Sequence, residues 1–123
     1  MGVAVAPIVL VVEDEPIIRL AAVDIVESAG FIAIEAANAD EAIRILESRT
    51  DIRIVFTDVN MPGSIDGLKL ARAVRHRWPP VKIVVVSGLI KLAPDDLPLD
   101  TVFLPKPYRS SQITQAFHDL LAS

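Results

Sequence analysis

The chain has 123 residues, which is room for one domain with a sizeable core and too little for two. Hydrophobic residues make up 52% of the chain, which excludes a disordered protein, and the absence of cysteine excludes disulfides, thiolate metal sites and cysteine nucleophiles. Because 12 Lys and Arg stand against 16 Asp and Glu, the formal net charge is -4, and binding of nucleic acid through a basic surface is not expected.

The longest uncharged stretch runs from Met1 to Val12. It has neither a basic start nor a small-residue cleavage site, and Pro7 interrupts it, so it is typical neither of a signal peptide nor of a membrane span. We therefore predict a soluble protein with a short tail over residues 1–7 and one domain over residues 8–123.

The first predicted elements are a strand, a helix and a second strand. Residues 8–12 are continuously aliphatic, which is typical of a strand covered on both faces. Pro16 suits the first turn of a helix, and Gly30 suits its C-terminal end. Residues 31–36 then form the second strand.

The middle of the chain repeats this alternation. Asn38 has the position of an N-cap with Glu41 three residues later, which predicts a second helix. Residues 54–57 form a third strand, and Asp66 can cap the helix that follows. Trp78 stands before two prolines, which predicts the end of that helix because the residue before proline avoids helical backbone angles.

The last third of the chain contains two strands and a clear final helix. Residues 81–86 and 101–104 are the strands, and prolines between them allow at most one or two helical turns over residues 89–100. The final helix is predicted by apolar residues at helical spacing. These are Ile113, Ala116, Phe117, Leu120 and Leu121.

Five strands that alternate with helices predict an α/β fold, a single doubly wound parallel sheet with helices on both faces and a short or irregular fourth helix. Right-handed crossovers and short connections favour the flavodoxin-like strand order 2-1-3-4-5. Since ligands of such sheets bind beyond the carboxyl ends of the strands, functional residues are expected at that edge.

Carboxylates follow two of the predicted strands at this edge. Glu13 and Asp14 come after the first strand and Asp58 after the third. Three neighbouring carboxylates are costly without a cation, because like charges oppose each other's ionisation. Lys106 offsets part of this charge, and oxygen ligands without His or Cys suit Mg²⁺. That Asp14 merely favours the start of the first helix is an alternative, but it explains neither Asp58 nor Lys106.

In four segments the chain resembles the CheY-like receiver domains of bacterial two-component response regulators. VVEDEP resembles their acidic pair, VFTDVNMPG the phosphoacceptor segment, VVVSG the hydroxyl-bearing end of the fourth strand, and FLPKPY the Lys-Pro motif after the fifth. Each segment is weak alone, but the four in this order and spacing cover nearly the whole chain. The resemblance implies a cytoplasmic signalling protein, and the chain is either a stand-alone single-domain receiver, which we favour, or a fragment of a longer protein.

The resemblance implies roles for the matched residues. Asp58 would accept a phosphoryl group from a histidine kinase or a histidine phosphotransfer protein. The metal, Mg²⁺, would be held by Glu13, Asp14, Asp58 and the backbone carbonyl of Asn60. Lys106 and Ser87 would bind the phosphoryl oxygens.

The resemblance also implies a switch and a backbone feature. Ser87 and Phe103 would be the switch residues, with Tyr108 as a rival aromatic that better suits an anchor of its loop. A cis bond would precede Pro107. The expected partners include neither nucleic acid nor membrane and allow a weak homodimer, and the only expected catalysis is the domain's own phosphorylation and dephosphorylation.

This sequence departs from the commonest receiver pattern in several places, of which three bear on the site and its output. Glu13 replaces an aspartate, Ser87 replaces a threonine, and prolines interrupt residues 89–100. Glu13 and the interrupted residues 89–100 leave a second hypothesis open, a receiver-like module that binds proteins independently of phosphorylation. A flavodoxin-type cofactor site and an aspartyl phosphatase are disfavoured, because the first strand is followed neither by a Gly- or Ser-rich loop nor by an Asp-x-Asp motif.

Overall fold

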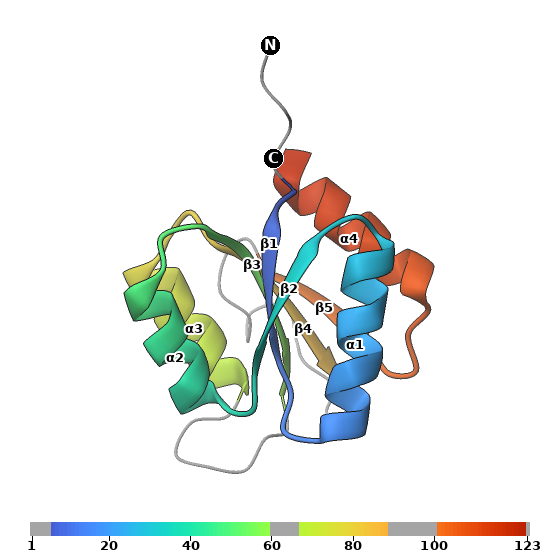
Figure 1. Ribbon diagram of the computed structural model, residues 1–123, viewed down its shortest axis with the longest axis horizontal. Helices are drawn as coiled ribbons and strands as arrows, with labels where there is room; N and C mark the ends of the chain where they lie inside the picture. The colour runs from blue at the N-terminus through green and yellow to red at the C-terminus, as the bar shows by residue number, and fades with distance from the viewer. Residues whose placement is uncertain (1–5, 60–66, 89–100, 123) are drawn as a thin grey trace.

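A computed structural model describes residues 6–59, 67–88 and 101–122. Strands and helices alternate through most of this part of the chain (Figure 1). In chain order the elements are β1 (Ile8–Val12), α1 (Pro16–Ser28), β2 (Ile32–Ala36), α2 (Ala39–Ser48), β3 (Ile52–Asp58), α3 (Gly67–Arg77), β4 (Lys82–Ser87), β5 (Thr101–Pro105) and α4 (Ser110–Ala122).

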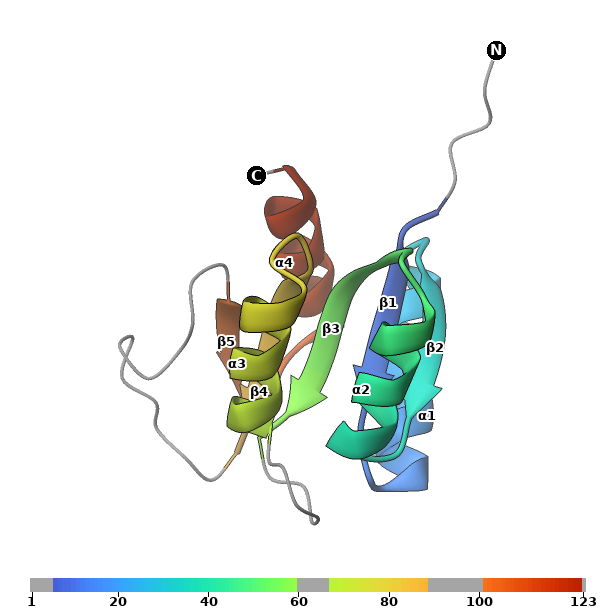
Figure 2. The same ribbon diagram turned by 90° about the vertical axis from the view of Figure 1, so that its left-hand side faces the viewer.

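The five strands form one parallel sheet in the order β2-β1-β3-β4-β5. Helices α1 and α4 cover one face of this sheet, and α2 and α3 cover the other (Figures 1 and 2). The predicted fold class, strand order and two-sided covering are therefore confirmed. All five strands run in the same direction, so their carboxyl ends share one edge.

The sheet separates two apolar cores. In β1, Leu10 and Val12 pack toward α2 and α3, whereas Val9 and Val11 pack toward α1 and α4. Because both faces are covered, every residue of β1 is buried, and this is why its sequence is continuously aliphatic. The other buried strands, β3 and β4, contribute to both cores in the same alternating way.

Three of the helix-end signals are also present in the structure. The side-chain oxygen of Asn38 accepts a hydrogen bond from the Glu41 backbone N–H at 2.8 Å, which satisfies a free N–H at the start of α2. Pro16 is the first residue of α1. Gly30, with φ of 93°, follows the end of α1 in a left-handed conformation that favours glycine.

The boundary of β3 differs from the prediction. The strand begins at Ile52, two residues earlier than expected, because exposed Arg53 interrupts the apolar run although its backbone is part of the sheet. Asp66, Asn60 and the short helix expected over residues 89–100 lie outside the described residues. Within the described part of the chain, each helix is too short or too polar to cross a membrane.

Candidate functional site

The predicted site residues gather at the carboxyl edge of the sheet. Glu13 follows β1, Asp58 ends β3, Ser87 ends β4 and Lys106 follows β5. Backbone hydrogen bonds extend the sheet pairing into this region. The Val59 N–H donates to the Val86 carbonyl at 3.0 Å, and the Lys106 N–H donates to the Ser87 carbonyl at 2.9 Å.

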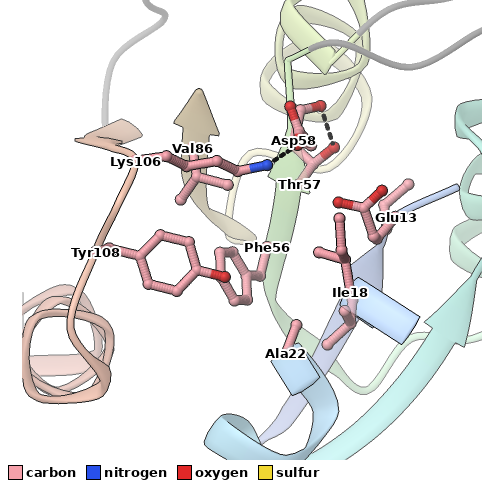
Figure 3. A pocket seen from close by; sticks show the side chains of 11 residues that line it. Glu13, Ile18, Ala22, Phe56, Thr57, Asp58, Val86, Lys106 and Tyr108 are labelled. Carbon is pink, nitrogen blue, oxygen red and sulfur yellow. Dashed lines mark hydrogen bonds and ion pairs between the residues drawn. The ribbon is translucent and has the colours of Figure 1, made fainter. Parts of the chain in front are cut away.

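Asp58 and Lys106 are joined directly. The Lys106 ammonium Nζ donates a hydrogen bond to Oδ2 of Asp58, and the two side chains point toward each other (Figure 3). The Asp58 side chain is only 9% exposed, and that of Lys106 is 30% exposed. Burial alone lowers the pKa of Lys106, but the hydrogen bond and charge of Asp58, together with the charge of Glu13, raise this pKa above its ordinary value.

Glu13 is the second buried carboxylate of the site. Its side-chain Oε2 accepts a hydrogen bond from the Glu15 backbone N–H at 3.0 Å. The pKa of Glu13 is raised to about 7: burial is the main cause, and the neighbouring Asp14 and Asp58 add to it, while the Glu15 N–H and Lys106 oppose it. The site therefore holds more negative charge than Lys106 compensates.

This excess of carboxylate charge fits a hard divalent cation, because the available ligands are oxygens and the buried Glu13 gains from a nearby positive charge. Over residues 6–59, 67–88 and 101–122, however, no three Asp, Glu, His or Cys side chains converge closely enough to hold a metal ion. Asp58 binds Lys106 and Glu13 binds the backbone of Glu15 instead. The site thus contains the oxygen ligands that Mg²⁺ prefers, but the carboxylates would have to turn toward a common point to bind the ion.

Two hydroxyl side chains lie beside the acceptor strand. Ser87 is buried at the end of β4, next to Val86, which pairs with Asp58 across the sheet. Thr57 is buried as well, and its Oγ1 donates to the carbonyl oxygen of Asp58 at 3.1 Å (Figure 3). The Thr57 hydroxyl is thereby engaged with the backbone.

The two rival aromatic residues lie on opposite faces of the sheet. Phe103 is half-buried in β5 and packs against the core under α2 and α3. Tyr108 packs against the core under α1 and α4, and its ring centroid is 6.1 Å from that of Phe56. Burial raises the pKa of the Tyr108 phenol. The Lys106–Pro107 peptide bond between these segments is cis.

Below Asp58 the site continues into a small apolar pocket (Figure 3). Its apolar walls come from Ile18 and Ala22 of α1, from Phe56 of β3 and Val86 of β4, and from Tyr108 in the loop before α4. The sequence did not identify this pocket, because Ile18 and Ala22 read as ordinary core positions of an amphipathic helix. The sequence does not single out Arg19 either, because it is only one charged residue among others within a predicted helix.

Comparison with known proteins agrees with this geometry. The family model of the response regulator receiver domain matches residues 9–118. The chain is 38% identical over 117 residues to the sensor kinase CckA of Brucella abortus, covering 92% of this chain and 12% of that protein. It is 32% identical over 125 residues to the aerobic respiration control protein ArcA of Escherichia coli K12, covering 94% of this chain and 49% of that protein.

Solved structures are similar along almost the full chain. A response regulator receiver protein from Sinorhizobium medicae superposes with a TM-score of 0.86 at 30% identity, covering 96% of both chains. The receiver domain of the hybrid histidine kinase CckA superposes with a TM-score of 0.78 at 30% identity, covering 93% of this chain and 98% of that one. The chain spans less than half the length of these two curated relatives. The chain belongs to the response regulator receiver domain family.

Proposed function

We propose that the chain is a signalling switch that accepts a phosphoryl group on Asp58 from a phosphohistidine of a histidine kinase or a histidine phosphotransfer protein. The observation that carries this proposal is the contact between the buried carboxylate of Asp58 and the Lys106 ammonium at the carboxyl edge of the sheet. The family membership supports it, and the similarity to a receiver domain of a hybrid histidine kinase favours this class of donor.

The reaction is a nucleophilic displacement at phosphorus. A carboxylate oxygen of Asp58 forms the new O–P bond while the P–N bond of the phosphohistidine breaks, and the electron pair stays on the imidazole nitrogen. In phosphoryl transfer the protein contributes mainly positioning and charge neutralisation. Lys106 would move from the Asp58 carboxylate to a phosphoryl oxygen, and the Ser87 hydroxyl would donate to another oxygen.

Glu13, Asp14 and Asp58, with the backbone carbonyl of Asn60, are the residues that we propose to hold Mg²⁺. When bound, the ion supplies positive charge that offsets the phosphoryl oxygens. The Glu13 side chain is one methylene longer than the aspartate more common in its place, and it should still reach the ion or one of its waters. Outside its own phosphorylation and dephosphorylation, we propose no enzymatic activity for the domain.

The new acyl phosphate would bring a charge near -2 to the edge of the sheet and so alter its surface. We propose that Ser87 and Phe103 transmit this change, because both lie in strands next to the acceptor strand. Ser87 ends β4, which pairs with β3, and Phe103 of β5 pairs with Val85 of β4. Phe103 lies under the face that α2 and α3 cover.

The experiment is intact-mass spectrometry after incubation with acetyl phosphate, with and without Mg²⁺. We expect the wild-type chain to gain one phosphoryl group only with Mg²⁺. Asp58→Asn should gain none, and Lys106→Met should gain it about 100-fold more slowly, as for loss of one charge-stabilising donor. Asp24→Asn, which removes an exposed carboxylate of α1, is the matched control and should behave as wild type.

The alternative function is a protein-binding module that works without phosphorylation. The observation that favours it is the separation of the described carboxylates, since no three of those side chains converge on one point. If the folded wild-type chain gains no mass from acetyl phosphate or from a panel of phosphorylated histidine kinases, the phosphoacceptor function is wrong and this module is favoured.

A further inference from the structure

Arg19 links the end of β1 to the neighbouring edge strand. From the first turns of α1, its Nη1 donates a hydrogen bond to the backbone carbonyl of Glu13 at 2.9 Å. Its Nε donates to Oε1 of Glu35 in β2 at 3.1 Å. The Arg19 side chain is 20% exposed and that of Glu35 is 52% exposed, so the guanidinium lies mostly within the protein while Glu35 borders solvent.

These contacts complete a set of bonds around Glu13. The Glu13 backbone N–H donates to the Ala36 carbonyl at 3.0 Å, and its carboxylate accepts from the Glu15 N–H at 3.0 Å. Arg19 adds the bond to the carbonyl oxygen. The backbone of Glu13 is therefore fixed on both sides at the point where the chain leaves the sheet and turns into α1.

We propose that Arg19 is a positioning residue for the carboxylates of Glu13 and Asp14. Its planar guanidinium makes two bonds in fixed directions, one to the turn and one to β2, so the turn is held relative to the sheet that carries Asp58. This inference rests on the function proposed above, in which Glu13 and Asp14 hold Mg²⁺. Removal of a residue that orients a metal ligand without touching the metal commonly lowers the metal affinity by about 10–100-fold.

Arg19 could act by positioning the turn or only as a nearby positive charge, and substitution of Arg19 by lysine distinguishes the two. Lysine keeps the positive charge of Arg19 but offers a single flexible ammonium in place of the planar fork. If Arg19 acts by position, Arg19→Lys and Arg19→Gln lose Mg²⁺ affinity alike. If it acts only as a nearby charge, lysine restores the affinity.

The test is calorimetric titration of the metal-free protein with Mg²⁺, without any phosphodonor. We expect Arg19→Lys and Arg19→Gln to bind Mg²⁺ about tenfold more weakly than wild type. Glu35→Gln, which loosens the guanidinium from the exposed side, should show a smaller loss in the same direction. Arg77→Gln removes a comparable ion pair, with Glu47 at 2.7 Å on the far side of the sheet, and should stay within about twofold of wild type.

A readout without metal accompanies the titration. In the metal-free protein, amide hydrogen exchange at Glu15 should be faster in both Arg19 variants, because the turn that holds its bond to Glu13 is released. Glu35→Gln leaves the core untouched and keeps the test valid if an Arg19 variant fails to fold. Unchanged Mg²⁺ affinity in Arg19→Lys, or wild-type protein that binds no Mg²⁺, would overturn the proposal. Wild-type protein that binds Mg²⁺ but takes no phosphoryl group would overturn the proposed function alone.

Discussion

The backbone carbonyl oxygen of Asp58 lies 2.1 Å from the position that a Cβ on Gly67 would occupy. The same Cβ would lie 2.7 Å from Cα of Val59, and the Gly67 N–H donates to the Val59 carbonyl at 3.0 Å. Helix α3 thus begins in direct contact with the backbone of the proposed acceptor. Only a residue without a side chain fits between them.

Gly67→Ala is expected to lower the free energy of unfolding by about 1–3 kcal/mol, because backbone atoms on both sides must separate to make room for the methyl group. The gain in helix propensity, at most about 1 kcal/mol, offsets part of this cost. Urea denaturation measures the change. Gly88→Ala is the matched control, since its Cβ would lie 3.3 Å from Cβ of Lys106 and would need a much smaller adjustment, so it should lose less stability. Equal stability of Gly67→Ala and wild type would contradict the close contact.

The raised pKa of Glu13 predicts that the stability of the protein depends on pH. Below about pH 4.5 the Glu13 carboxyl is protonated in both the folded and the unfolded chain and contributes nothing. Between pH 4.5 and its folded pKa of about 7, the unfolded chain ionises first, so the free energy of unfolding falls as pH rises and stays reduced above pH 7. The facing charges are Asp14, Asp58 and Lys106, of which only Lys106 favours ionised Glu13.

Glu13→Gln removes this ionisation and retains an oxygen for the Glu15 N–H. In metal-free buffer, we expect the variant to be more stable than wild type at pH 8 by about 1–3 kcal/mol, and to differ much less at pH 5. Denaturant unfolding at the two pH values checks this. A stability difference that is the same at pH 5 and pH 8 would show that the pKa of Glu13 is not raised. The same variant should bind Mg²⁺ more weakly, because it loses a charged ligand.

Phosphorylation is expected to change the surroundings of Phe103 more than those of the other three phenylalanines. Phe31, Phe56 and Phe117 form edge contacts with ring centroids 5.4 and 5.8 Å apart in the core under α1 and α4. Phe103 is half-buried on the other face, in the edge strand β5, where rotation costs fewer contacts. ¹⁹F NMR of protein labelled with fluorophenylalanine, before and after acetyl phosphate with Mg²⁺, measures the shifts.

Assignment by single Phe→Leu variants identifies each ¹⁹F resonance, and Asp58→Asn serves as the unphosphorylated control. The largest shift in Phe56, beside Tyr108, would move the switch to the α1 and α4 face and contradict the role of Phe103. Equal small shifts in all four resonances would speak against an aromatic switch altogether.

Much of the fold was predictable because the physical constraint is local. Strands covered on both faces must be apolar at every position, as β1 is, and parallel strands bring their carboxyl ends to one edge, which is why Asp58 and Lys106 were expected together. The start of β3 was missed because Arg53 is exposed within a strand that is otherwise buried. Hydrophobicity marks burial of side chains, whereas sheet pairing is made by the backbone.

Other features depend on contacts between distant parts of the chain. Arg19 meets Glu35 across 16 residues, and the Cβ site of Gly67 is occupied by the backbone at Asp58, so neither could be inferred from local periodicity. The side of the sheet on which Phe103 lies follows from its pairing with Val85 in β4, which needs the register. Tyr108 lies beyond the end of β5, where strand alternation no longer assigns a face.

The separation of the two apolar cores by the sheet gives the protein two intrinsic optical probes. Its one tryptophan, Trp78, packs against the core under α2 and α3, and its one tyrosine, Tyr108, packs against the core under α1 and α4. Tryptophan fluorescence and the near-ultraviolet circular dichroism of tyrosine therefore report on different halves of the molecule. Coincident unfolding curves from the two signals would mean that both halves melt as one cooperative unit, held together by the strands they share.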